Sequence, residues 1–433
     1  MMIAESAKTM LYRYRWYVFL TLLCSYFFVY FHRMTVGILG GDIVSEVGGT
    51  VGILSSVYFW TYTAMQIPSG LLADHLGPRK ASFIFMSLAA LGSFLTAFGT
   101  EFWHIVLGKV FIAMGMAIVY IPLMKIISVW YRKSDFPQLN GLVIAVGNVG
   151  AIAASAPLEM LSDSIGGWRN VFIFLGILTM LLALLIVVFV RDHPHHKGLP
   201  GIDEIVSEET GEPVSDRTDA RMPVLKGLRL VFSGGRRFWN MALAYFLVYG
   251  SIMVFQGTWA KYYFNNAYDF AYSVAWFITL IGVGKILSTI TIGVLNGRGI
   301  LRSKRRAMLF GTFLYLCIWA VLWLEAGQID NYWFWMGICF LFGFFGGFMS
   351  LSFTQVKEWY PISIAGTAVS ATNTFLFLGS SVCTTIAAAI MGSTYLLDDF
   401  RTLWMLMFVA AVLAFILVFF SLEKKPGDAL VTE

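Results

Sequence analysis

The sequence predicts an all-α membrane protein with twelve transmembrane helices in two pseudo-symmetric six-helix bundles. Three observations support this fold class: the composition, a series of apolar segments of bilayer length, and an internal repeat. Hydrophobic residues make up 58% of the 433 residues, and charged residues make up only 13%. A soluble chain of this composition could not cover its apolar surface with polar groups, so we expect lipid to be its solvent.

A helix needs roughly 20 apolar residues to cross a bilayer, and the chain divides into twelve such segments at loop signals. The segments lie at about 16–40, 51–72, 81–100, 105–130, 138–160, 170–190, 238–263, 271–296, 307–325, 333–356, 364–391 and 403–421. One long polar stretch, 191–237, is rich in Pro, Gly, Asp and Glu. We therefore expect an N-terminal bundle at 1–190, a linker at 191–237 and a C-terminal bundle at 238–433.

Basic residues orient these segments, because cytoplasmic loops collect Lys and Arg. With the N-terminus inside, the outer loops carry only Arg169 and Arg401. The inner segments hold the basic residues of the linker and Lys8, Arg13, Arg15, Arg79, Lys80, Arg132, Lys133, Arg298, Arg302, Lys304, Arg305, Arg306, Lys424 and Lys425. Both termini are therefore predicted to be cytoplasmic, and the compact loops without Asn-x-Ser/Thr sequons are compatible with a bacterial inner membrane.

An internal repeat relates the two halves. Segment 1 reads Tyr-Phe-Phe-Val-Tyr at 26–30, and segment 7 reads Tyr-Phe-Leu-Val-Tyr at 245–249. Segments 5 and 11 each contain a Gly followed seven residues later by an Asn, namely Gly141 with Asn148 and Gly366 with Asn373. The ordered set of matches indicates duplication, which in membrane proteins suggests a midplane site and alternating access.

The turn between segments 2 and 3 carries the most specific motif, GLLADHLGPRK at 70–80. Gly70 permits close helix packing, Gly77 lets the turn adopt unusual dihedral angles, and Asp74 can accept from helix N-termini or from Arg79 and Lys80. We interpret these residues as a gating element. The motif closely resembles the loop signature of the major facilitator superfamily, and the resemblance extends over essentially the whole chain. It implies the major facilitator fold.

Five basic residues fall within the predicted spans: Arg33, Lys109, Lys125, Lys261 and Lys285. Each costs roughly 2.5 to 3.5 kcal/mol at a helix centre, so each needs a partner, a cavity or a route to the interface. No Asp or Glu occupies the middle of a span, and the nearest acids, Glu159 and Glu325, lie at predicted outer ends. An anionic substrate would supply the missing negative charge.

Arg33 and Lys285 are the strongest candidates for substrate binding. Arg33 lies about 17 residues, or roughly 26 Å, from the inner end of its helix and cannot easily reach the interface. Lys285 lies near the middle of segment 8, in the opposite half, so an anion bridging the two would stabilise an occluded state. Segment 1 also resembles that of the glycerol phosphate and sugar phosphate antiporters, in which an arginine at the place of Arg33 binds phosphate. Their second arginine, near Val248 or Tyr249 here, is absent, which leaves anions in general favoured.

Two of the remaining basic candidates have two interpretations each. Lys125 can line the cavity or reach the inner interface, and Lys261 can serve an outer vestibule or belong to an aromatic belt. Lys109 is expected to belong to helix packing. Neutral polar residues on the cavity-facing helices either bind substrate or join helices: Tyr30, Tyr58, Tyr62, Gln66, Asn148, Gln256, Thr354, Gln355 and Asn373.

The leading functional hypothesis is secondary active or facilitative transport of a small organic anion, a carboxylate or else a phosphate or sulfonate, by symport or antiport. Proton coupling would need His32, a carboxylate at a span end or the substrate itself. The alternatives are efflux of lipophilic or cationic compounds and a non-transporting membrane sensor on the same fold. We expect a monomer in the lipid bilayer without catalytic residues, bound metal, cofactor or nucleic acid, because motifs for these are absent from the sequence.

Overall fold

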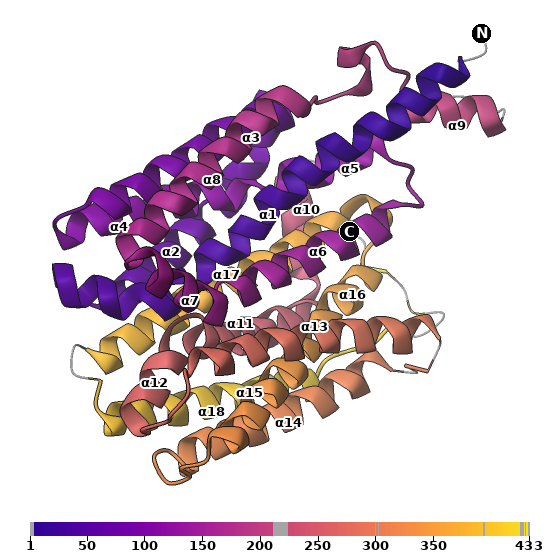
Figure 1. The fold of residues 1–433 in the computed structure, drawn as a ribbon. Coiled ribbons are helices and arrows are strands. Elements are labelled where there is room, and N and C mark those ends of the chain that lie inside the picture. Colours follow the sequence, from indigo (N-terminus) through magenta and orange to yellow (C-terminus); the bar gives the residue numbers. More distant parts are fainter. Residues whose placement is uncertain are drawn as a thin grey trace. The chain divides into compact units, whose positions relative to one another are not determined.

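The computed structural model describes residues 4–210, 224–298, 300–301, 303–392, 395–424, 428 and 430–431, and part of the predicted linker, 211–223, lies outside them. The described residues form helices joined by short turns, and no strand occurs among them (Figure 1). Within this part of the chain, eleven helical segments are long and apolar enough to cross a membrane. The prediction of an all-α, multi-pass membrane protein is confirmed.

The predicted second span is divided between two elements, which explains why eleven segments correspond to twelve predicted spans. α2 (Val51–Ala64) is short, and the chain continues into α3 (Gln66–Phe98). At Gly77 the backbone of α3 is not helical, with φ 78° and ψ 157°. The second span therefore consists of α2 and the first part of α3, and the third span begins after Gly77.

Three predicted spans are interrupted three residues before a proline. The breaks fall at Met65 before Pro68, at Val119 before Pro122, and at Ala154 before Pro157. Proline has no backbone N–H to donate to the carbonyl four residues earlier, and its ring clashes with that carbonyl. The prolines thus account for the division of these spans into α2 and α3, α4 and α5, and α6 and α7.

One compact unit contains residues 4–33, 64–154 and 160–210 among those described. Its elements are the first part of α1 (Glu5–Val47), α3, α4 (Phe102–Ile118), α5 (Tyr120–Trp130), α6 (Phe136–Ala153), the end of α7 (Ala156–Ile165), α8 (Trp168–Phe189), a 3₁₀ turn (Pro194–Lys197) and α9 (Ile202–Thr210). α3 packs along α4 and α8, and α9 lies beside the N-terminal end of α1 (Figure 1). We call this unit 1.

Unit 2 contains residues 34–63, 155–159 and the described residues from 224 onward. Besides α2 and the end of α1, it comprises α10 (Val224–Ser233), a 3₁₀ turn (Gly235–Arg237), α11 (Trp239–Val254), a π-helical turn (Phe255–Trp259), α12 (Ala260–Ala267), α13 (Ala275–Gly297), α14 (Lys304–Leu324), α15 (Tyr332–Gly346), a 3₁₀ turn (Gly347–Ser350), α16 (Leu351–Glu358), α17 (Ile362–Met391) and α18 (Leu397–Phe419). α11 packs against α17 and α18, and α13 packs against α15.

The same close backbone approach occurs in each unit. A Cβ at Gly150 of α6 would lie 2.2 Å from the carbonyl oxygen of Phe27, and a Cβ at Gly379 of α17 would lie 2.1 Å from that of Phe246. Phe27 and Phe246 occupy equivalent positions of the repeated pentapeptide. Small residues let membrane helices pack this closely. The repeat in the sequence is therefore also a repeat in helix packing.

Candidate functional site

Arg33 lies on α1 within unit 1 and packs on an aromatic ring. Its side chain is buried, with only 3% of the residue exposed. The guanidinium carbon lies 4.5 Å from the ring centroid of Tyr30. The ring of Tyr30 contacts that of Tyr26 edge-on at 5.5 Å, and Tyr26 in turn contacts Tyr120 at 5.5 Å. Arg33 is thus the cationic end of a cluster of tyrosines contributed by α1 and α5.

Three other residues of unit 1 that the sequence analysis singled out are also buried. His32 is fully buried next to Arg33 on α1, and Asn148 on α6 is 5% exposed. Lys109 is fully buried on α4, and its ammonium lies 4.5 Å from the ring centroid of Phe172 on α8. The Lys109 contact joins two neighbouring helices, which is consistent with the packing role predicted for it.

Lys285 lies on α13 within unit 2, where it packs on Tyr249 of α11. The ammonium nitrogen lies 5.1 Å from the ring centroid of Tyr249. Tyr249 contacts Phe377 of α17 edge-on at 6.0 Å, and Phe377 contacts Tyr62 of α2 at 4.4 Å. Tyr62 in turn stacks on Tyr58 at 6.1 Å. Three predicted residues, Lys285, Tyr62 and Tyr58, therefore belong to one continuous cluster.

Sequence reasoning missed the two residues that connect this cluster, Tyr249 and Phe377. Tyr249 carried a signal, because it is the last residue of the repeated pentapeptide and is equivalent to Tyr30. Phe377 carried none, since an apolar residue in an apolar helix is not distinctive. Two further predicted polar residues of unit 2 differ in setting. Asn373 is half-buried on α17, and Gln355 is fully buried and donates to the carbonyl oxygen of Leu422 at 2.9 Å.

The motif at 70–80, predicted to be a gate, forms a turn that is fastened to the end of α8. As the sequence predicts, Gly77 adopts unusual dihedral angles. The backbone N–H of Arg79 donates to Asp192 at 2.6 Å, and the Arg79 side chain donates to the carbonyl oxygen of Val187 at 2.6 Å. Lys80 is exposed. Asp192, which follows α8, was not singled out from the sequence because its partner is 113 residues away.

Lys125 of α5 forms an ion pair with Asp74 of the same motif. Both side chains are partly exposed, at 31% and 58%. Lys125 was predicted as a substrate-binding candidate with an open alternative at the inner interface. The structure places it against the gating motif, where it links α5 to α3. At Gly70, one turn before Asp74, an added Cβ would make only an ordinary van der Waals contact, 3.9 Å from the side chain of Ile121.

Lys261 of α12 forms a second ion pair, with Glu159 of α7. The ammonium and carboxylate are 2.5 Å apart, and their side chains are only 16% and 20% exposed. Lys261 also donates to the carbonyl oxygen of Ile38 at 3.0 Å, and the hydroxyl of Ser273 donates to Glu159. Hydroxyl pairs nearby bring further segments of unit 2 together, namely Ser55 with Thr258 at 2.6 Å and Ser155 with Thr279 at 2.8 Å.

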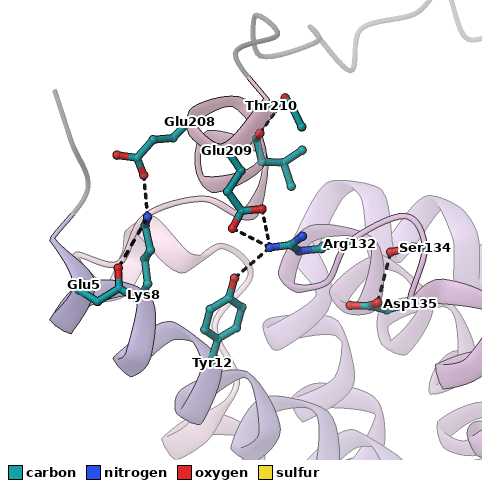
Figure 2. A network of polar contacts seen from close by, with 10 residues as sticks. Glu5, Lys8, Tyr12, Arg132, Ser134, Asp135, Glu208, Glu209 and Thr210 are labelled. Atoms are coloured by element: carbon teal, nitrogen blue, oxygen red, sulfur yellow. Dashed lines mark hydrogen bonds and ion pairs between the residues drawn. The ribbon is translucent and has the colours of Figure 1, made fainter.

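Within unit 1, a separate charged network joins α9, which lies in the predicted linker, to α1 and to the turn after α5 (Figure 2). Lys8 of α1 pairs with Glu208 of α9 at 2.9 Å, and Arg132 pairs with Glu209 at 2.8 Å. Arg132 also donates to the hydroxyl of Tyr12 at 3.3 Å. The Tyr12 hydrogen bond, followed by the influence of Glu209, raises the pKa of Arg132. The network holds α9 in place without taking part in the two tyrosine clusters.

Among the described residues, eleven helical segments of bilayer length define a multi-pass integral membrane protein. Comparison with known proteins agrees with this class. The chain matches the Major Facilitator Superfamily over residues 22–384 and, in a second match, 242–432. These matches cover most of the chain, so the protein belongs to the Major Facilitator Superfamily.

Two similar relatives carry names that refer to organic anions. A probable sulfoacetate transporter of Cupriavidus necator is 26% identical over 294 residues, which are 66% of this chain and 66% of that protein. A probable hexose phosphate transport protein of Chlamydia trachomatis is 23% identical over 395 residues, or 86% of this chain and 84% of the relative.

A solved structure shows the same fold. It is the crystal structure of a bacterial homologue of the human lysosomal transporter Spinster, in an inward-facing and unoccupied conformation. The TM-score is 0.66 at 18% identity, with 96% of this chain and 99% of that chain covered. The predicted major facilitator fold is confirmed.

Proposed function

We propose that this protein carries a small organic anion across the membrane by alternating access. The observation that carries the proposal is the pair of intramembrane cations Arg33 and Lys285, one in each half of the repeated sequence and each packed on a tyrosine ring. The sequence provides no Asp or Glu in the middle of a predicted span. A charge at membrane depth is costly, and such residues commonly mark the path of a substrate or ion.

The two relatives support the anionic class without fixing the compound. One is named for sulfoacetate and the other for hexose phosphates, and both compounds combine acidic groups with a small organic body. We propose a carboxylate as the primary cargo, with a sulfonate or phosphate as the other candidates. Tyr30, Tyr58, Tyr62, Asn148, Asn373 and Gln355 complete the proposed set of substrate-binding residues. Lys125 and Lys261, which the sequence also offered as binding residues, are proposed instead to hold helices together through their ion pairs with Asp74 and Glu159.

The motif at 70–80 is proposed to act as a gate. Gly70, Asp74, Gly77, Arg79 and Lys80 form the gate, and the Lys125–Asp74 ion pair supports its placement next to α5. His32 is the proposed coupling residue if transport is proton-linked, because it is buried beside Arg33. Anion exchange needs no such group.

The placement of the chain in the membrane is also a proposal. Residues 1–190 and 238–433 form the two bundles, joined by the linker at 191–237. Both termini face the cytoplasm, and the membrane is the bacterial inner membrane. The excess of Lys and Arg in the predicted inner loops supports this orientation. The protein acts as a monomer and without a cofactor, and no catalytic step is proposed because the named relatives are transporters.

A ligand-stabilisation screen tests the anionic class. Purified protein is heated with acetate, succinate, sulfoacetate, glucose 6-phosphate or the cation tetraphenylphosphonium. A compound at about 100 times its Kd stabilises the folded state by about 2.7 kcal/mol, which shifts the unfolding midpoint measurably. We expect stabilisation by an anion, and loss of that stabilisation in Arg33→Gln and Lys285→Met.

The control is Lys304→Met, which removes the same charge from an ion pair with Glu358 at 2.9 Å. This variant should keep the anion response. Stabilisation by tetraphenylphosphonium alone would favour cation efflux. A protein that responds to no compound in the screen, and moves none of them, would favour the sensor alternative.

A further inference from the structure

A tyrosine pair with a cation recurs in the two units. In unit 1 the rings of Tyr26 and Tyr30 meet at 5.5 Å and 65°, and Arg33 lies over the ring of Tyr30. In unit 2 the rings of Tyr245 and Tyr249 meet at 6.0 Å and 85°, and Lys285 lies over the ring of Tyr249. In both units the cation covers the second tyrosine of the repeated pentapeptide.

The two cations reach this position from different parts of the backbone. Arg33 follows Tyr30 by three residues on the same helix, a spacing that brings side chains together on one face. Lys285 belongs to α13, whereas Tyr249 belongs to α11. The local spacing of one helix therefore cannot account for both contacts. What the two units share is the tyrosine and the cation over its face.

A ring holds a cation in a different way from a carboxylate. The face of an aromatic ring attracts a cation by about 0.5 to 2 kcal/mol, but the ring carries no net charge. The contact fixes the place of the charge without neutralising it. The Lys125–Asp74 and Lys261–Glu159 contacts are ion pairs between opposite full charges. Lys125 and Lys261 thus contact acids, whereas Arg33 and Lys285 contact tyrosine rings.

We propose that Tyr30 and Tyr249 are positioning residues for the transported anion. Each ring orients the cation of its unit, Arg33 or Lys285, toward the acidic group of the solute. The tyrosines act through the cations and contribute to the affinity for the anion. This inference rests on the proposed anion transport, and it adds the residues that determine how tightly the anion is held.

Nuclear magnetic resonance tests the ring contact independently of transport. Reductive methylation with ¹³C labels the lysine ammonium groups and keeps their charge, and Lys285→Arg identifies the signal of Lys285. The ring current of Tyr249 should move this signal upfield in the wild type and in Tyr249→Phe, which keeps the ring. Tyr249→Leu should return it toward the position of exposed lysines. An unchanged signal in Tyr249→Leu would overturn the proposed contact.

Uptake into proteoliposomes tests the effect on affinity, with sulfoacetate and succinate as probes. Tyr249→Leu should raise KM roughly twofold to thirtyfold with little change in kcat, and Tyr249→Phe should restore the wild-type KM. Tyr245→Leu, the control, removes the other ring of the same pair and should leave KM within about twofold. In unit 1, Tyr30→Leu and Tyr30→Phe should show the same contrast, with Tyr26→Leu as the control.

The outcomes separate this inference from the function on which it rests. If Lys285→Met raises KM but Tyr249→Leu does not, anion transport stands and the positioning role fails. Equal defects in Tyr249→Phe and Tyr249→Leu would also overturn it, since the hydroxyl rather than the ring face would then be responsible. If neither Arg33→Gln nor Lys285→Met changes KM, the proposed function itself fails. Where neither probe is carried, the uptake comparison uses the anion that stabilises the wild type in the thermal screen.

Discussion

The Lys261–Glu159 ion pair allows a quantitative test of how unit 2 is held together. The two groups are 2.5 Å apart, and their side chains are only 16% and 20% exposed. Removing one partner of a buried pair costs about 3 to 5 kcal/mol, because the other charge stays in a poorly solvated place. Since about one fifth of each side chain remains exposed, we expect the lower end, about 3 kcal/mol, for Lys261→Met or Glu159→Gln.

The midpoint of thermal unfolding in detergent measures this effect. In a unit of roughly 250 residues, 1 kcal/mol corresponds to about 2 to 4 °C, so each single variant should lose about 6 to 12 °C. The double variant should lose less than either single variant, because it leaves no uncompensated charge. Asp398→Asn is the control, since its pair with Arg401 is exposed and should change the midpoint by about 2 °C or less.

Two results would refute this reasoning. The first is that both single variants unfold within about 2 °C of the wild type. Solvent would then screen the Lys261–Glu159 ion pair as it screens ion pairs on a protein surface. The second is a double variant whose loss equals the sum of the single losses. Lys261 and Glu159 would then act independently, and the ion pair would have no energetic role.

Three further predictions concern the gating turn and the linker. Gly77→Ala should lower the unfolding midpoint and the transport rate, because φ is +78° there and an added Cβ would lie 2.8 Å from a carboxylate oxygen of Asp192. Gly70→Ala is the control and should not lower the midpoint, because its Cβ would make only an ordinary contact at 3.9 Å. Lys125→Met should slow turnover in an uptake assay with little change in KM, and Asp74→Asn should give the same defect if the two residues act as one unit. A raised KM for Lys125→Met alone would instead favour a contact between Lys125 and the substrate. Glu209→Gln should increase proteolysis of the linker at low salt, because it breaks the exposed ion pair with Arg132, and should have little effect at 1 M salt, where that pair is already screened. Equal cleavage of the variant and the wild type at low salt would contradict the role of this ion pair in holding α9.

Most of the fold could be predicted from the sequence because bilayer length and loop charge are local signals. The apolar segments correspond to helices throughout the described residues, and the repeat at 26–30 and 245–249 recurs in helix packing. The internal breaks were not predicted, although prolines mark three of them. Whether a proline bends a membrane helix or interrupts it depends on the neighbouring helices that satisfy the freed carbonyl, and these are not visible in the sequence.

The candidate site was less predictable, because its contacts join helices far apart in the chain. Arg33 and Lys285 stand out by their depth, but the sequence does not show that each lies on a tyrosine ring. For Asp74, the sequence suggested helix N-termini or the neighbouring basic residues as partners, whereas the structure pairs it with Lys125. Only the folded chain shows which charges meet.

Uptake of a labelled anion by reconstituted protein tests the central claim most directly. Proteoliposomes containing the wild type should take up sulfoacetate or succinate with saturable kinetics. Arg33→Gln and Lys285→Met should each reduce kcat/KM about tenfold to hundredfold, as expected for the loss of a charged hydrogen bond to the solute. Lys304→Met should behave like the wild type. Wild-type kcat/KM in both Arg33→Gln and Lys285→Met, or uptake of tetraphenylphosphonium in place of the anions, would contradict the account.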